Sequence, residues 1–209
     1  MASTFRPEHG RRSDDVVRPN TTVLEATRSI LLHRMRAPSP YTIHMLHVQF
    51  YLGDESTVSI AQAVANTIAR QKVIASLEFA ILTKARKNFA DGNELLTYGR
   101  QFMSLLDSCP NTFRGLARLT LENLRLGESG FPKNFSICKQ LEFLRLYHCD
   151  MGVGSLLTVE HPQLSELVIA GSSLIKRVDL KWVPKLMLLK FNVFRSQDDP
   201  FCLGYVPML

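Results

Sequence analysis

A leucine pattern that recurs four times constrains the fold of this chain more than any other feature of its sequence. The stretch QLEFLRLYHC, residues 140–149, has the form L-x-x-L-x-L-x-x-C. Its L-x-x-L-x-L part occurs in four copies, whose last apolar residues are Leu121, Leu146, Ile169 and Phe191. The copies are therefore 25, 23 and 22 residues apart. Four copies at this consistent spacing favour a repeating structure over a chance run of leucines.

Successive side chains of a β-strand point to opposite faces of the sheet, which explains why the last two apolar residues of the pattern lie two positions apart. We expect Leu144 and Leu146 to point inward and to stack on the equivalent residues of neighbouring copies, while Arg145 points outward. One copy cannot bury its leucines alone, so such units are stable only as a stack. Leucine-rich repeats share this period and spelling. The sequence thus predicts an α/β solenoid, curved, with parallel strands on its concave face and helices or short strands on its convex face. The alternative is a chance run of leucines in a two-layer α/β domain.

The segments between the copies differ in kind. Residues 130–138 are compatible with a short helix or 3₁₀ turn on the convex side. Residues 157–159 and 178–180 alternate like strands and predict short convex strands there. Pro162 and Pro184 precede two of the leucine strands, where a proline restricts the backbone without occupying the ladder.

The N-terminal half predicts helices and strands that lead into these repeats. Thr22 and Ser59 each open a capping-box pattern, which is typical of a helix start, and Pro110 should follow the end of another helix. The expected elements are a helix from Thr22 to Arg36, a strand at 46–52, a helix from Ser59, a strand at 77–81, a surface loop at 91–93 and a helix at 98–108. We interpret residues 1–20 as a disordered tail, 21–115 as irregular repeats of the same solenoid and 116–209 as the leucine-rich repeats.

The composition argues against several classes of protein. No run is apolar enough to span a membrane, and the first residues, MASTFRPEHGRRSDD, lack the apolar core of a secretory signal. The four cysteines, Cys109, Cys138, Cys149 and Cys202, form no C-x-x-C pair, so we expect reduced thiols in the cytoplasm or nucleus. The formal net charge is +6, but the basic residues are scattered, and a solvated basic face explains them better than a nucleic-acid site.

The sequence offers little for catalysis, and we expect neither an enzyme nor a cofactor or metal. His148, Cys149 and Asp150 are adjacent, but neighbouring strand residues point to opposite faces and cannot converge simply. Cys149 is better interpreted as a buried residue at the turn after the strand, where these repeats place Asn or Cys. His44 and His47 should face opposite ways as well, which argues against a shared metal.

The outward positions of the repeat strands form the candidate site, a concave face that binds a protein partner. Phe143 and Tyr147 flank Arg145, and aromatic and arginine residues are enriched at binding hot spots. The candidate partner-binding residues are Arg118, Thr120, Glu122, Phe143, Arg145, Tyr147, Glu166, Lys190 and Asn192. A merely solvated face is the alternative for any one residue. A basic solenoid that binds nucleic acid or a small ligand is the alternative for the whole chain.

Five phrases give the repeats a more specific resemblance. They are LARLTLENLRLGES (116–129), CKQLEFLRLYHCD (138–150), VEHPQLSELVI (159–169), VDLKWVPKL (178–186) and SQDDPFCLGYVP (196–207). From about Thr22 to Leu209 the chain resembles the large plant family of F-box/leucine-rich-repeat proteins. The resemblance implies a substrate receptor of a cullin-type ubiquitin ligase, in which the F-box binds the Skp adaptor and the repeats hold the protein to be ubiquitinated.

The chain departs from that family at the adaptor-binding part. The resemblance implies an F-box that opens on a Leu-Pro acidic phrase and closes on a Trp. Here the phrase is missing and the only Trp is Trp182. We therefore expect an interaction module with an unknown protein target and without binding to the Skp adaptor. A non-functional fragment of a receptor gene is the remaining alternative.

The last residues repeat an earlier strand entry. Val206–Leu209 matches Val183–Leu186 one repeat later, so a further strand is expected to begin at Leu209. The strand at 186–192 should then be the last of its ladder, without the polar cap that solenoids carry. Because open sheet edges pair with other chains, we expect weak self-association through this C-terminal edge.

Overall fold

Four helices and nine strands make up the described part of the chain, which is residues 14–36, 42–53, 55–70, 74–84, 92–127, 135–152, 156–172, 175–192 and 200–209 of the computed structural model. The helices are α1 (Asp14–Arg36), α2 (Glu55–Arg70), α3 (Gly92–Ser108) and α4 (Pro110–Arg114). The strands are β1 (Ile43–Tyr51), β2 (Ile74–Leu82), β3 (Leu116–Glu122), β4 (Phe143–Tyr147), β5 (Leu156–Glu160), β6 (Glu166–Ala170), β7 (Arg177–Trp182), β8 (Leu188–Asn192) and β9 (Phe201–Tyr205). They form an α/β structure with two parallel sheets.

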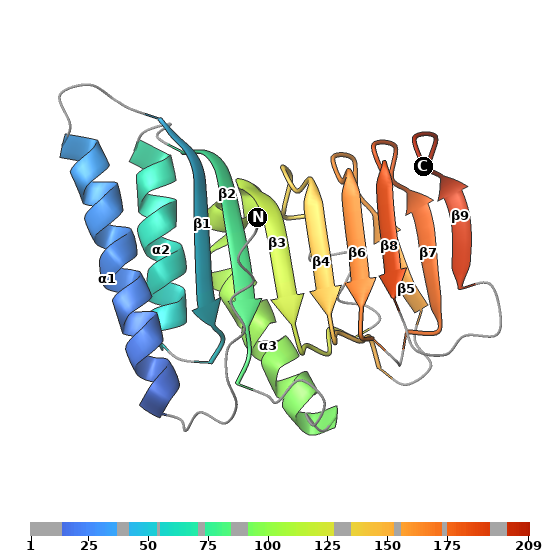
Figure 1. Ribbon diagram of the computed structural model, residues 1–209, viewed down its shortest axis with the longest axis horizontal. Coiled ribbons are helices and arrows are strands. Elements are labelled where there is room, and N and C mark those ends of the chain that lie inside the picture. The colour runs from blue at the N-terminus through green and yellow to red at the C-terminus, as the bar shows by residue number, and fades with distance from the viewer. Residues whose placement is uncertain are drawn as a thin grey trace, which may run out of the picture.

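Six strands form the larger sheet in the order β1-β2-β3-β4-β6-β8, all parallel (Figure 1). The leucine pattern sets its register, because Leu119 pairs with Leu144, and Leu144 with Leu167. These three leucines are at most 1% exposed, whereas Arg145, which follows Leu144 in β4, is exposed. The predicted alternation of inward and outward residues is therefore confirmed in these strands, and β8 lies at the edge of the sheet as the repeat register predicts.

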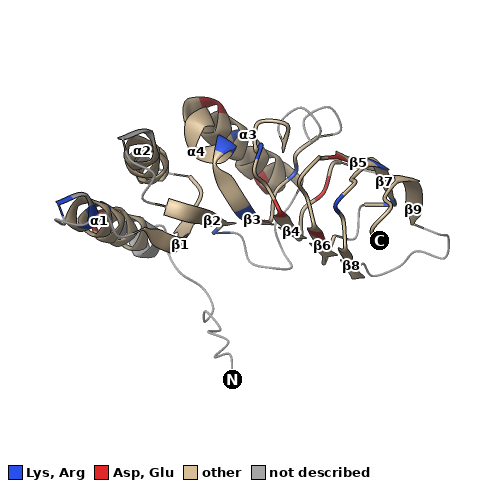
Figure 2. Cartoon of the chain, turned by 90° about the horizontal axis from the view of Figure 1, so that it is seen from above, with Lys and Arg blue, Asp and Glu red and all other residues tan. Residues whose placement is uncertain are grey.

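Three strands, β5, β7 and β9, form a second parallel sheet. It lies on the same side of the larger sheet as α2, α3 and α4, towards the C-terminal part (Figure 2). Leu157, Val178 and Leu180 of β5 and β7 are fully buried and belong to one core with the leucines of the larger sheet. The predicted strands at 157–159 and 178–180 are confirmed. The repeat register places the next strand at Leu209 and misses β9, which extends this second sheet instead.

Three helices begin earlier than the sequence predicts. α1 starts at Asp14 rather than Thr22, so residues 14–20 of the expected disordered tail are helical, with Pro19 inside the helix. α2 starts at Glu55 rather than Ser59, and α3 starts at Gly92 within the expected surface loop. The physical reason for α1 and α2 is tertiary, because both are anchored to the end of β1. The Asn20 amide donates to the Tyr51 carbonyl at 2.8 Å, and the Thr57 hydroxyl donates to the same carbonyl at 3.1 Å.

A turn with left-handed backbone follows three successive strands of the larger sheet. Asn123, His148 and Gly171 have φ of 56°, 51° and 70°. Each backbone N–H donates to the next strand: Asn123 to the Tyr147 carbonyl at 3.0 Å, His148 to the Ala170 carbonyl at 2.9 Å and Gly171 to the Asn192 carbonyl at 2.9 Å. The same turn and the same inter-strand bond thus recur with the leucine pattern.

Within the described residues, no helix is both long and apolar enough to cross a bilayer. The predicted short helix at 130–138 falls mostly outside the described residues, and so does the N-terminal tail up to residue 13.

Candidate interaction face

All nine candidate residues lie on one face of the larger sheet, in three registered rows. The first row aligns Arg118, Phe143 and Glu166 across β3, β4 and β6. The second aligns Thr120, Arg145, Val168 and Lys190, and the third aligns Glu122, Tyr147, Ala170 and Asn192. The sheet therefore brings together side chains that are up to 74 positions apart in the sequence, from 118 to 192.

This face is turned away from the helices and the second sheet (Figure 2). No described helix or strand packs on it, so its side chains meet solvent. Arg145, Lys190 and Asn192 are exposed, and the other six candidate residues are half-buried against their neighbours. We refer to the outward side of β1, β2, β3, β4, β6 and β8 as the interaction face.

Arg118 is the centre of a charged cluster in the first row. Its Nε lies 2.7 Å from Oε1 of Glu78, its Nη1 lies 3.9 Å from Oε1 of Glu166, and its guanidinium stacks on the Phe143 ring at 4.0 Å. The second carboxylate oxygen of Glu78 lies 3.0 Å from Nδ1 of His47. Residues of three strands, β2, β4 and β6, thus contact the Arg118 guanidinium, and these contacts fix its position.

Glu78 and His47 belong to the interaction face, although the leucine pattern did not point to them. They pair in register across β1 and β2, and Glu78 pairs with Arg118 of β3. The signal that could have identified Glu78 is the alternation of Leu77, Phe79 and Ile81, which places it on the outward side of a predicted strand.

The second row has a different electrostatic character. The Arg145 guanidinium lies 5.5 Å from the Tyr147 ring centroid, so the aromatic ring orients it. Lys190 stands two strands away, with the half-buried Val168 in register between the two cations. Among the described residues, no carboxylate lies within ion-pair distance of Arg145 or Lys190.

All four cysteines are free thiols, and two of them, Cys138 and Cys149, are fully buried and placed for packing. Burial raises the pKa of both thiols to about 12, so they stay protonated at neutral pH. The Cys149 thiol donates to the Leu121 and Tyr147 carbonyls at 3.5 Å, which confirms its predicted place at the turn after β4.

His148 and Asp150, the neighbours of Cys149, serve other contacts. The His148 Nδ1 lies 2.9 Å from the Gly171 carbonyl, and Asp150 pairs with Arg125 at 2.6 Å. The three adjacent residues therefore do not converge on a common point. Among the described residues, no group of three His, Cys, Asp or Glu side chains is arranged to hold a metal ion.

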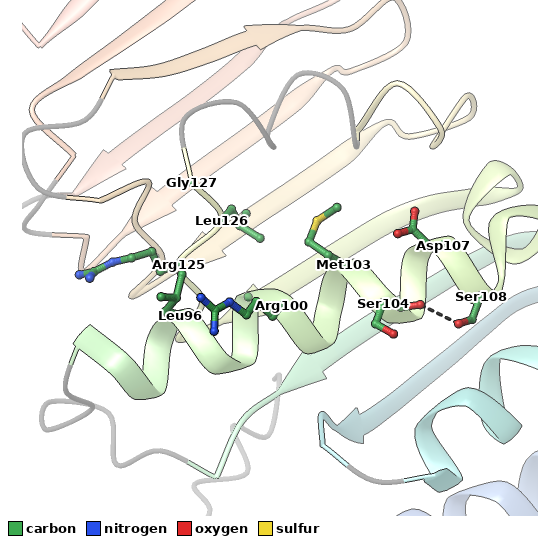
Figure 3. Close-up of a pocket in the computed structure, with 10 residues that line it drawn as sticks. Leu96, Arg100, Met103, Ser104, Asp107, Ser108, Arg125, Leu126 and Gly127 are labelled. Atoms are coloured by element: carbon green, nitrogen blue, oxygen red, sulfur yellow. Dashed lines mark hydrogen bonds between the residues drawn. The ribbon is translucent and has the colours of Figure 1, made fainter.

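A pocket of about 530 Å³ lies on the helical side of the sheet, between α3 and the segment that follows β3 (Figure 3). Its lining comprises Leu96, Gly99, Arg100, Met103, Ser104, Asp107, Ser108, Arg125, Leu126 and Gly127. The charged groups in this lining are two guanidiniums and one carboxylate, and Arg125 is already paired with Asp150. The lining also holds the hydroxyls of Ser104 and Ser108, but the Ser108 hydroxyl donates to the Ser104 carbonyl at 2.7 Å, and among the described residues no hydrogen bond joins either serine to Asp107. The pocket is therefore a weaker candidate than the interaction face.

Comparisons of the chain with protein-family models, curated proteins and solved structures return no match. The choice among functions therefore depends on the geometry of the interaction face, on its exposed charges and aromatic rings, and on the burial of the thiols.

Proposed function

We propose that this chain is a protein-interaction module whose interaction face binds a protein partner, and that it is not an enzyme. The observation that carries the proposal is the face itself: six registered parallel strands present Arg, Lys and aromatic side chains on one side while their other side buries the core. Arginine and aromatic residues are the types that most often dominate binding energy at protein interfaces. A rigid sheet also holds them at low entropic cost.

The proposal includes a finer architecture, a leucine-rich-repeat solenoid. Three features support it: the 22–25-residue period of the leucine pattern, the in-register stacking of each copy on the next, and the left-handed turn that recurs after β3, β4 and β6. In such an array each unit contacts its neighbours and the strands line one extended surface. That surface is the interaction face.

The resemblance to F-box/leucine-rich-repeat proteins suggests the kind of role. By that resemblance the face corresponds to the part of a ubiquitin-ligase receptor that recognises the protein to be ubiquitinated. The proposal concerns recognition only. We do not expect these 209 residues to bind the Skp adaptor, because they lack the opening phrase and the closing Trp of an F-box.

A pair of matched threonine substitutions tests the proposal. Thr120 of β3 lies in the centre of the interaction face, and Thr158 of β5 lies on the outer side of the second sheet; both are half-buried. We expect Thr120→Arg to remove the proteins that the immobilised chain retains from a plant-cell lysate, and Thr158→Arg to leave them bound. Thermal unfolding of both variants controls for folding. Identical retention by both folded variants would contradict the proposal.

A further inference from the structure

The cationic side chains of the interaction face differ in how many contacts they already make with carboxylates and aromatic rings. Arg118 has carboxylates from two strands and a ring beneath it, so it has little left to offer a ligand. Arg145 is exposed, and among the described residues its one contact with a charged or aromatic group is with the Tyr147 ring, which carries no compensating charge. Lys190 is exposed as well, without an ion pair among the described residues. Two cations in one row are therefore available to an anionic ligand.

The spacing of these two cations has a specific match in peptide geometry. Arg145 and Lys190 are in register through Val168, so their strands are two strand spacings apart, or about 10 Å. A polyproline II segment has three residues per turn and rises about 3.1 Å per residue, so side chains at positions i and i+3 lie on the same side about 9 Å apart. Two carboxylates spaced in this way can each reach one cation. Val168 then meets the apolar residue between them.

The surroundings favour a peptide over a nucleic acid. Carboxylates of Glu78 and Glu166 lie in the row on one side of the two cations, and Glu122 lies in the row on the other side. A polyphosphate backbone carries a charge at every step and would run against these carboxylates. A peptide with two isolated carboxylates avoids them. The half-buried Tyr147 ring beside Arg145 also suits a proline side chain, because proline-rich segments dock on aromatic side chains.

We infer that the interaction face takes an acidic, proline-containing segment of its protein partner in polyproline II conformation, with two carboxylates three positions apart, one on Arg145 and one on Lys190. This inference rests on the proposed function and adds the chemistry of the partner. The formal net charge of +6 adds long-range attraction for an acidic partner.

Fluorescence anisotropy with defined peptides tests the inference on the full chain. The probe is a labelled twelve-residue proline-rich peptide with glutamates at positions i and i+3, measured at low salt. We expect Arg145→Glu/Lys190→Glu to weaken its binding at least about tenfold, because two attractions become repulsions. The matched control is Arg177→Glu, an exposed charge reversal on β7 of the second sheet, which should stay within about twofold of the unsubstituted chain.

Peptide controls separate charge, spacing and ligand class. Replacing both glutamates by glutamine, or moving them to adjacent positions, should weaken binding at least about fivefold, and added salt should weaken binding of the original peptide. The inference would be overturned if the glutamine peptide or the adjacent-glutamate peptide bound as tightly as the original peptide. It would also be overturned if the Arg145→Glu/Lys190→Glu variant bound the original peptide as tightly as the unsubstituted chain. Tighter binding of a single-stranded RNA through the same two cations would overturn it in favour of nucleic acid. If the inference fails while Thr120→Arg still removes the retained proteins, the face remains a protein-binding site with different chemistry.

Discussion

Arg125 and Asp150 join the segments that follow β3 and β4 through a bidentate ion pair on the helical side of the sheet. The Arg125 Nε donates to Asp150 Oδ1 at 2.6 Å, and its Nη2 donates to Oδ2 at 3.2 Å. The backbones meet as well, since the Asp150 N–H donates to the Leu124 carbonyl and the Leu126 N–H to the Asp150 carbonyl, both at 2.9 Å. The Asp150 side chain is 6% exposed and that of Arg125 19%, so the pair is held largely out of water.

We expect Arg125→Ala to lower the free energy of unfolding by about 2–3 kcal/mol, because it leaves a buried carboxylate without its cation. Among the described residues, the Asp150 side chain would then keep the Gly152 N–H, at 3.0 Å, as its one hydrogen-bond partner. The matched control is Arg100→Ala on the exposed side of α3, which should cost less than about 0.5 kcal/mol. Urea unfolding of both variants is the measurement. Equal losses would show that the ion pair contributes nothing specific.

Two adjacent residues of β4 test the inward and outward assignment. Leu144 is 1% exposed in the core, and Arg145 is exposed on the interaction face. Leu144→Asp should cost several kcal/mol and unfold the neighbouring repeats, because it buries an unpaired charge. Arg145→Asp should change stability by no more than about 0.5 kcal/mol. Thermal unfolding followed by circular dichroism compares them, and equal destabilisation would contradict the assignment.

The leucine strands were predictable because period-two burial is a local property of the sequence. The inward orientation of Leu119, Leu144 and Leu167 follows from the two-residue alternation of the apolar residues around each of them. The helix starts were not predictable from their caps, because Asn20 and Thr57 anchor α1 and α2 to Tyr51, and such tertiary bonds leave no local pattern.

The candidate site was predictable in part for the same reason. Its positions on β3, β4, β6 and β8 follow from the repeat register. The cluster of His47, Glu78 and Arg118 depends on pairing between β1, β2 and β3, whose connecting segments are long and of irregular length. Without a shared spelling in β1 and β2, the sequence could not align these strands with the repeats.

His148 occupies a backbone conformation that constrains its replacement. Its φ of 51° lies in the left-handed region, which glycine adopts freely and β-branched residues adopt at a cost of about 1–2 kcal/mol. We therefore expect His148→Val to be less stable than His148→Gly by at least about 1 kcal/mol. Both variants lose the contact between the ring and the Gly171 carbonyl, so that loss does not distinguish them. Chemical denaturation of the two variants measures the difference, and equal stability would refute the recurring turn at this position.

His161 should make stability depend on pH. Its Nε2–H donates to the Cys138 carbonyl at 2.9 Å, and its Nδ1 accepts from the Gln163 N–H at 3.2 Å, so the bonded form is neutral. Burial lowers the pKa of His161, aided by Lys139, against the opposing bond to Cys138. As pH falls below about 6.5, the unfolded chain takes up a proton that the folded chain does not. The free energy of unfolding should therefore fall as the pH is lowered from 7.5 towards the pKa of His161 in the folded chain.

The matched variant for this pH effect is His161→Gln, which keeps a polar side chain and removes the titration. Its free energy of unfolding should fall less between pH 7.5 and 5.5 than that of the unsubstituted chain, whatever its absolute stability. Urea midpoints across this range supply the comparison. Parallel curves for the two proteins would show that His161 titrates alike in the folded and unfolded states.

Site-specific photo-cross-linking shows whether a protein partner occupies the interaction face. A benzoylphenylalanine at Thr120 reports on the centre of that face, and one at Thr158 reports on the outer side of the second sheet. After irradiation in cells that produce each variant, we expect a covalent adduct with a second protein from position 120 and none of comparable yield from position 158. Equal adduct yields from both positions, or an adduct from position 158 alone, would contradict this expectation.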